Sequence, residues 1–198
     1  LNLILKNLES PYEDFIVGIS SFKCENMEIN LKLTNLIESN TSLDDKLILQ
    51  FFNAEKIASW KHLYLAAFFT IQSYFNKFIK SKVIELELLR WASAKKNIKN
   101  SIKELGVNSE IKNIALLIIG KSEKEILNKI NLFFKDSGLK EDIELLEIDN
   151  NKFKELKQIF EISNNDYESL KTINLDDNKY DLLMKLIINR MSSLILRN

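Results

Sequence analysis

The chain has 198 residues, of which 45% are hydrophobic and 28% charged, and its 28 cations balance its 28 anions. This length and composition fit a single domain over residues 1–198 with an ordinary core, and they exclude wholesale disorder. One histidine and one cysteine are too few for an ordinary zinc site or an internal disulfide, so we expect no metal and a reducing compartment.

Two further absences narrow the class of protein. The sequence contains neither of the two common glycine-rich nucleotide loops, and no apolar run approaches the roughly 18 residues of a membrane span. We therefore expect a cytoplasmic protein without a cofactor or a membrane partner, which is nuclear as well if its source is eukaryotic.

The first part of the chain predicts two strands before any long helix. Residues 15–19 form a short apolar run typical of a buried strand, and residues 47–52 predict a second strand that ends at Asn53. Residues 26–38 fit both a helix and a strand, with the helix favoured, and a polar loop is expected at 40–45.

Helices dominate the middle of the chain. Ser59 is placed to cap a helix over about residues 60–79, whose apolar residues recur at helical spacing. Beyond it, two shorter helices are predicted with a break at Ser93, which would cap the second of them. Gly106 is placed to end that second helix.

The next part alternates strands with helices. Residues 114–119 form a continuous β-rich apolar run, as expected of a central strand covered on both faces. Ser122 opens a capping-box pattern that predicts a helix to about residue 135. We expect another strand at 143–148, a helix through Phe160, and then polar turns.

The last predicted element is a long helix over about residues 179–196. Leu183, Ile187 and Met191 line one side of it, yet other apolar residues lie beyond that side, so we expect a partner protein to cover part of the helix. Together the elements predict a mixed α/β (α+β) domain. Its small mixed or antiparallel sheet is flanked by helices, with a helix–break–helix in the middle.

The stretch from residue 77 to residue 106 carries the densest positive charge. Its eight cations outnumber its anions by more than two to one in a neutral chain, which favours contact with a polyanion. Lys95 and Lys96 would fall in the first turn of the helix capped by Ser93, where cations oppose the helix dipole. A helix N-terminus flanked by lysines predicts a phosphate site. A solvated lysine-rich face is the other interpretation.

Three ring side chains lie near this charge. Trp91 and Tyr74 could stack on unpaired bases, although a ring among leucines and isoleucines favours core packing for Trp91. We interpret His62, the only histidine, as a surface or capping side chain rather than a catalyst, because no carboxylate or nucleophile is tied to it by spacing.

Three segments carry a family resemblance. Asn53-Ala-Glu55, Lys61-His62-Leu63 at a helix start, and ELELLRWASAKKNIKNSIKELG are similar to the KEOPS subunit family that includes the animal PRPK-binding protein (TPRKB/Cgi type). The likeness runs from about residue 47 to residue 120 and continues more faintly to the C-terminal helix.

The last of these segments departs from the family at three positions. The family's Ser-Gly-x-Arg-Gln-Ile falls on residues 93–98, where Ala94 stands in place of the usual Gly. Lys96 replaces Arg, which keeps the charge but loses the planar fork of donors, and Asn97 replaces Gln with a shorter amide.

The resemblance implies a non-enzymatic subunit of KEOPS, the complex that installs threonylcarbamoyl on the adenosine beside the anticodon of tRNAs. Such a subunit binds the small kinase/ATPase of the complex (PRPK type), meets the other subunits indirectly, and captures the single-stranded 3′ CCA end of tRNA. We accordingly assign tRNA binding to Lys61, His62, Arg90, Ser93, Lys95, Lys96 and Asn97. Kinase binding is assigned to Leu183, Ile187 and Met191. The alternative is a protein–protein scaffold with a solvated lysine-rich face and no specific RNA binding.

Overall fold

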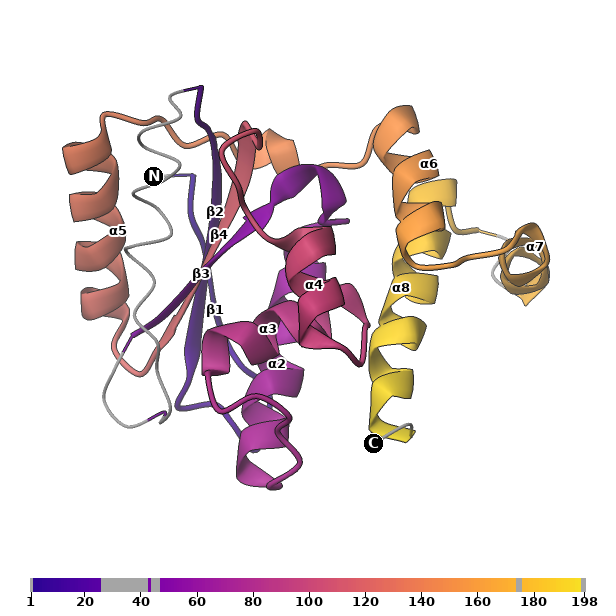
Figure 1. Cartoon of the computed structure of the whole chain (residues 1–198), viewed down its shortest axis with the longest axis horizontal. Helices are drawn as coiled ribbons and strands as arrows, with labels where there is room; N and C mark the ends of the chain where they lie inside the picture. Colours follow the sequence, from indigo (N-terminus) through magenta and orange to yellow (C-terminus); the bar gives the residue numbers. More distant parts are fainter. Residues whose placement is uncertain (1, 26–42, 44–46, 174–175, 197–198) are drawn as a thin grey trace.

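A four-stranded antiparallel sheet lies at the centre of the molecule (Figure 1). The computed structural model describes residues 2–25, 43, 47–173 and 176–196. The strands follow the order β1-β2-β4-β3 across the sheet, and every neighbouring pair is antiparallel. Their bounds are β1 Ile4–Asn7, β2 Ile16–Lys23, β3 Ile48–Asn53 and β4 Asn113–Gly120.

Strand β4 is the central strand that its unbroken apolar run predicts. It pairs with β2 on one side and β3 on the other, and residues 114–120 are all buried. Alternate side chains of β4 point to opposite faces of the sheet. Ile114, Leu116 and Ile118 pack on the face covered by α5, and the residues between them join the larger core on the other face.

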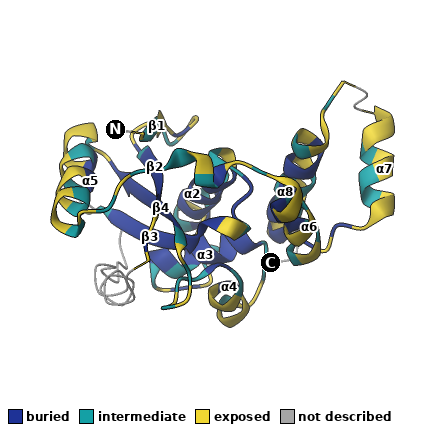
Figure 2. Cartoon of the chain, turned by 90° about the horizontal axis from the view of Figure 1, so that it is seen from above, coloured by how far each residue is buried: buried dark blue, intermediate teal, exposed yellow. Residues whose placement is uncertain are grey.

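The helices form layers on the two sides of this sheet. Among the described helices, α5 covers one face, whereas α2 and α3 cover the other, with α8 and α6 packed outside them and α7 outermost (Figures 1 and 2). The bounds are α2 Trp60–Phe75, α3 Ile84–Ser93, α4 Ile98–Leu105, α5 Glu123–Ser137, α6 Asn150–Ile159, α7 Asn164–Ile173 and α8 Lys179–Leu196. The described residues also form two short 3-10 helices, η1 Ala54–Lys56 and η2 Ile143–Leu146.

Close packing between α5 and the sheet requires a glycine in β2. A Cβ atom on Gly18 would lie 2.7 Å from Cγ2 of Ile118 and 2.9 Å from Cγ2 of Ile126. Such contacts are too short for carbon atoms, so the missing side chain lets α5 sit against β2 and β4.

Several sequence predictions are confirmed. The fold is a mixed α+β domain with a helix–break–helix and a long C-terminal helix. Ser122 caps α5 by accepting the N–H of Glu125 at 3.4 Å. Gly106 follows the last residue of α4, and Trp91 is fully buried, as core packing requires.

Two predicted elements differ in the structure, and a third follows below. The long middle helix ends at Phe75 rather than near residue 79, because Lys77 adopts a left-handed conformation with φ 60°. The strand expected at 143–148 is the 3-10 helix η2. This segment makes one bridge to β2, between Phe22 and Glu141, and then turns away.

The polar turns expected before residue 177 contain helix α7. Ser163 accepts the N–H of Asp166 at 3.0 Å, and the Asp166 carboxylate accepts the N–H of Ser163 at 3.0 Å. This reciprocal capping starts the helix. The helix favoured over residues 26–38 lies outside the described residues, as does the loop at 40–45 apart from Leu43.

Two chemical features are missing from the described part of the chain. None of its helices is both long and apolar enough to cross a membrane. Within the same residues, no group of three or more histidine, cysteine, aspartate or glutamate side chains is placed to hold a metal ion.

Candidate nucleic-acid interface

The turn between α3 and α4 contains most of the predicted tRNA-binding residues. Ser93 ends α3, and Ala94 follows in the left-handed conformation, with φ 53° and ψ 27°. Asn97, not Ser93, caps α4, because its Oδ1 accepts the N–H of Lys99 at 2.8 Å. Lys95 and Lys96 therefore lie in the link before α4. The prediction that they occupy its first turn is wrong.

Ser93 has a structural task in this turn. Its side chain is fully buried, and its Oγ lies 2.8 Å from Oγ of Ser101 and 3.1 Å from the carbonyl oxygen of Arg90. It also accepts the N–H of Lys95 at 3.3 Å. The hydroxyl therefore fixes the start of the turn and is not directed at a ligand.

A small groove opens beside this turn. Its cavity of about 160 Å³ is lined by residues 93–96, by the C-terminal end of α6 at residues 159–161, and by Arg190 and Leu194 of α8. Lys95 spans it, since its Nζ lies 2.6 Å from Oε1 of Glu161. Lys96 is exposed at the rim. The groove thus brings together three cations and one carboxylate.

Arg190 is the groove residue that the sequence analysis missed. Its guanidinium donates to the carbonyl oxygens of Phe160 at 3.3 Å and Glu161 at 3.1 Å, and to Asp166 at 3.0 Å. It therefore ties α8 to the end of α6 and adds positive charge to the groove. No local motif marks it, because it stands in a different part of the chain from Lys95 and Lys96.

His62 is buried, so of its two interpretations, a surface or a capping side chain, the surface position is wrong. Its Nδ1 accepts the N–H of Ala58 at 3.2 Å, and its Nε2 lies 2.7 Å from the carbonyl oxygen of Ala92. This arrangement requires a neutral ring with the proton on Nε2. Burial is the main cause that lowers the pKa of His62 to about 4, with a smaller contribution from the charge of Lys152. The ring cannot reach a phosphate; it ties the start of α2 to the end of α3.

Arg90 is likewise buried, and it does not border the groove. Its Nε donates to Oε1 of Glu87 at 2.7 Å, and its guanidinium carbon lies 4.5 Å from the centre of the Trp91 ring. Of the predicted cations near the groove, Lys61 is exposed but points its Nζ toward the ring of Trp60, at 5.9 Å from the ring centre.

The three residues assigned to kinase binding lie inside the protein. Leu183, Ile187 and Met191 are all fully buried in the larger core, on the side of α8 that packs on α2 and α3. They shape the position of α8 without reaching its outer surface. The apolar residues of the same helix that remain partly exposed include Leu186, Ile188 and Ile195, the last with 40% of its surface exposed.

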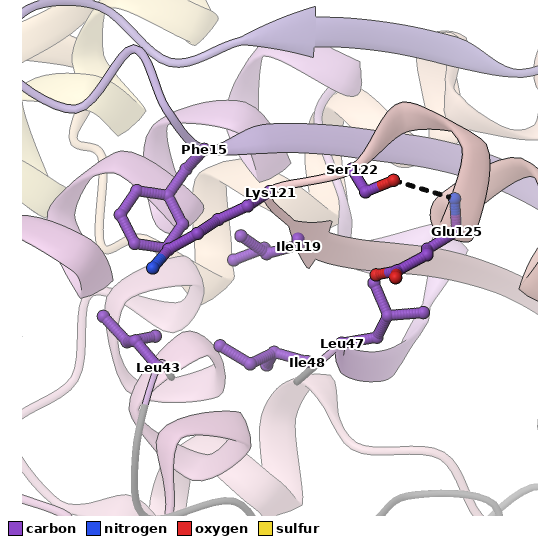
Figure 3. Close-up of a pocket in the computed structure, with 9 residues that line it drawn as sticks. Phe15, Leu43, Leu47, Ile48, Ile119, Lys121, Ser122 and Glu125 are labelled. Carbon is purple, nitrogen blue, oxygen red and sulfur yellow. Dashed lines mark hydrogen bonds between the residues drawn. The ribbon is translucent and has the colours of Figure 1, made fainter. Parts of the chain in front are cut away.

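A second cavity, of about 230 Å³, lies at the far end of β3 and β4 and contains none of the predicted residues. Its walls are apolar, with Phe15, Ile48 and Ile119 facing the interior (Figure 3). Two of the polar side chains at its rim have structural partners. Lys121 holds its Nζ 5.5 Å from the centre of the Phe15 ring, and Ser122 caps α5.

The geometry of the groove fits a binding protein. The groove offers cations from two segments of the chain, and the single histidine is fixed in the core by hydrogen bonds at both ring nitrogens. The chain belongs to the family of the kinase-binding protein CGI-121, whose family model matches residues 27–194. Members of this family are non-catalytic, kinase-binding subunits, so the predicted resemblance is confirmed. Among individually curated proteins, none matches the chain.

The buried His62 predicts a pH dependence of stability. Because the folded-state pKa of about 4 lies below the ordinary value of 6.5, the unfolded chain binds the proton first as the pH falls. The His62 contribution to the free energy of unfolding should be complete above pH 6.5. It should be lost between pH 6.5 and pH 4, by on the order of 3 kcal/mol. Urea unfolding at intervals across this range measures it.

The control for this prediction is His62→Gln, which lacks the titrating ring. The wild type should be more stable than the variant at pH 7, and this difference should shrink toward pH 4. An equal difference at both pH values would contradict a buried neutral histidine.

Ala94 predicts a gain in stability on substitution. A left-handed conformation costs a residue with a Cβ about 1–2 kcal/mol, so Ala94→Gly should raise the free energy of unfolding by about 1 kcal/mol after the greater chain entropy of glycine is subtracted. Ala92→Gly, two residues earlier within α3, is the matched control and should destabilise by about 1 kcal/mol or more. Loss of stability in both variants would contradict the predicted backbone strain at Ala94.

Proposed function

We propose that the chain is the KEOPS subunit that binds the kinase/ATPase of the complex and holds the 3′ CCA end of tRNA for threonylcarbamoyladenosine modification. The family match over residues 27–194 supports the kinase partner. The observation that carries tRNA binding is the groove at residues 93–96, where the family motif and the cations coincide. The proposed protein is cytoplasmic and non-catalytic.

Phosphate recognition in the groove follows from its charges. Lys95 and Lys96 place two cations at the groove, and Arg190 of α8, which pairs with Asp166, adds a third. In the free protein Lys95 is paired with Glu161, whose side chain is 77% exposed. A tRNA phosphate therefore replaces the Glu161 carboxylate as the partner of Lys95. An exposed ion pair of this kind contributes about 1 kcal/mol or less, so the exchange costs little.

The left-handed conformation of Ala94 affects how closely RNA can approach the groove. Only glycine adopts this conformation without strain, and the family usually has glycine at this position. Here the methyl group of Ala94 lies in the lining of the cavity. We infer that the RNA backbone approaches this turn less closely than a glycine would allow, and that Lys96 binds phosphate as a point charge without a planar fork.

The first test compares tRNA with and without its CCA end. Wild-type protein should bind intact tRNA at least about tenfold more tightly, and Lys95→Glu with Lys96→Glu should remove that preference. Glu161→Gln should strengthen binding about twofold to fivefold, because it frees Lys95. Affinity should fall with salt concentration in proportion to the phosphates contacted. Fluorescence anisotropy with end-labelled tRNA measures each value.

Equal affinity for the two tRNA forms would remove specific capture of the CCA end. A tRNA affinity that does not change with salt concentration would rule out the phosphate contacts. Either result, with kinase binding intact, would favour the alternative of a protein–protein scaffold whose lysines are solvated.

For the kinase, we propose the outer flank of α8 as the contact surface. Leu183, Ile187 and Met191 hold this helix against the core, and Ile188 and Ile195 present apolar surface beyond the buried side. The N-terminal part of α8 lies beside α2, where Ser59 Oγ lies 3.5 Å from Sδ of Met184. The side chains inside the core thus act indirectly, by positioning the flank.

Substitution on this flank tests the kinase contact. Ile188→Glu with Ile195→Glu should weaken binding to the purified kinase at least about tenfold, since a charge in an apolar contact costs more than 1 kcal/mol. Leu132→Glu is the matched control, because Leu132 is 54% exposed on α5 at the opposite face of the sheet. Calorimetry gives both affinities. An equal loss in the two variants, or none in the first, would contradict this surface.

A further inference from the structure

The loop between α2 and α3 has a fixed backbone. The Glu87 carboxylate accepts the N–H groups of Lys80 at 3.2 Å and Ser81 at 3.0 Å. At the start of the loop, the N–H of Phe78 donates to the carbonyl oxygen of Ser73 at 3.0 Å. The carboxylate that organises the loop is itself fully buried and bound to Arg90. The loop therefore presents its remaining side chains on a rigid frame.

Three of those side chains are uncompensated cations. Lys77, Lys80 and Lys82 are all exposed, and no ion pair joins any of them to another described residue. Because Glu87 faces the interior, it does not neutralise them at the surface. Rigid backbone and unpaired charge together lower the cost of binding a polyanion.

An aromatic surface adjoins these lysines. Phe75, the last residue of α2, is 52% exposed. The ring of Tyr12 stacks on it, with 5.7 Å between ring centres and 13° between planes. Tyr74 and Phe15 meet Phe75 edge-on. Large exposed rings are unusual on a surface that only has to remain solvated.

We propose that Tyr12, Phe75, Lys77, Lys80 and Lys82 form a second RNA-contacting surface, separate from the groove. An unpaired base stacks on the exposed part of Phe75, and the lysines bind the neighbouring phosphates. This combination of rings and cations is the one that single-stranded RNA requires. A partner peptide with acidic residues would satisfy the lysines but would leave the rings without a specific task.

Acidic residues limit where the phosphates can lie. Glu9, Glu13 and Asp14 are exposed in the connection between β1 and β2, which also carries Tyr12. They repel phosphates from that side. The RNA backbone therefore passes over the α2–α3 loop, and the base points back toward Phe75 and Tyr12.

The distance between the two surfaces determines what RNA can use both. The groove adjoins the C-terminal end of α3, whereas this surface lies at the C-terminal end of α2, and His62 joins the start of α2 to the end of α3. The 16 residues of α2 therefore separate the surfaces by about 24 Å at 1.5 Å per residue. A folded tRNA is large enough to touch both. The identity of this RNA rests on the proposed function.

The test removes charge and ring separately in the full chain. Phe75→Ala should lower affinity for an oligouridylate of ten nucleotides about tenfold and leave affinity for polyglutamate unchanged. The triple change of Lys77, Lys80 and Lys82 to Ala should reduce the salt slope of tRNA binding by about 2 to 3. The matched control changes Lys124, Lys129 and Lys135 of α5 to Ala, which removes equal charge from the other face of the sheet. Thermal unfolding confirms that each variant is folded.

The outcomes separate this surface from the groove. The triple lysine change in the α2–α3 loop should weaken binding of tRNA with and without the CCA end by the same factor. Lys95→Glu with Lys96→Glu in the groove should weaken binding of the intact form only. Equal effects of the loop and control triples would overturn the proposal in favour of diffuse charge. An equal effect of Phe75→Ala on oligouridylate and polyglutamate would overturn it in favour of an acidic peptide. Failure of CCA discrimination alone would overturn the proposed function and leave this surface intact.

Discussion

The two hydrogen bonds of His62 are the link on which the groove depends. They join the backbone just before α2 to the last turn of α3, and the ring also meets Phe160 edge-on at 5.4 Å. One side chain thus sets the spacing between the turn at residues 93–96 and the end of α6, the two main walls of the groove. Because this link works only with a neutral ring, a surface that presents cations is held in place by an uncharged histidine.

Local chemistry made much of the fold predictable. The β-rich run of β4, the Ser122 cap, Gly106 after α4 and the apolar pattern of α8 each depend on residues close together in sequence, and each is found as predicted. The Ser163–Asp166 pattern belongs to the same class of signal and could have located α7. Strand order and the antiparallel pairing depended on contacts between distant segments, so the sequence left them open.

The candidate site was predictable in position but not in detail. Ser93 and Asn97 are both good capping residues, and the choice between them depends on Ser101 and the Arg90 carbonyl, which hold the Ser93 hydroxyl. Arg90 stands beside the motif in sequence and was therefore assigned to tRNA binding, whereas the folded chain uses it to pair Glu87. Arg190 was not predicted for the same reason, since it is distant in sequence from the turn at residues 93–96 and lies beside it only in the folded chain.

Helix α8 borders two of the proposed binding surfaces, the groove and the kinase flank. Arg190 on one side of it contributes to the groove, and Ile188 on another side lies on the proposed kinase flank. Any shift of α8 on binding one ligand would couple the two sites, and linkage then requires the effect of each ligand on the affinity for the other to be equal in size. A kinase that shifts α8 by a fraction of an ångström would thereby alter the affinity for RNA, and bound RNA would alter the affinity for the kinase by the same factor.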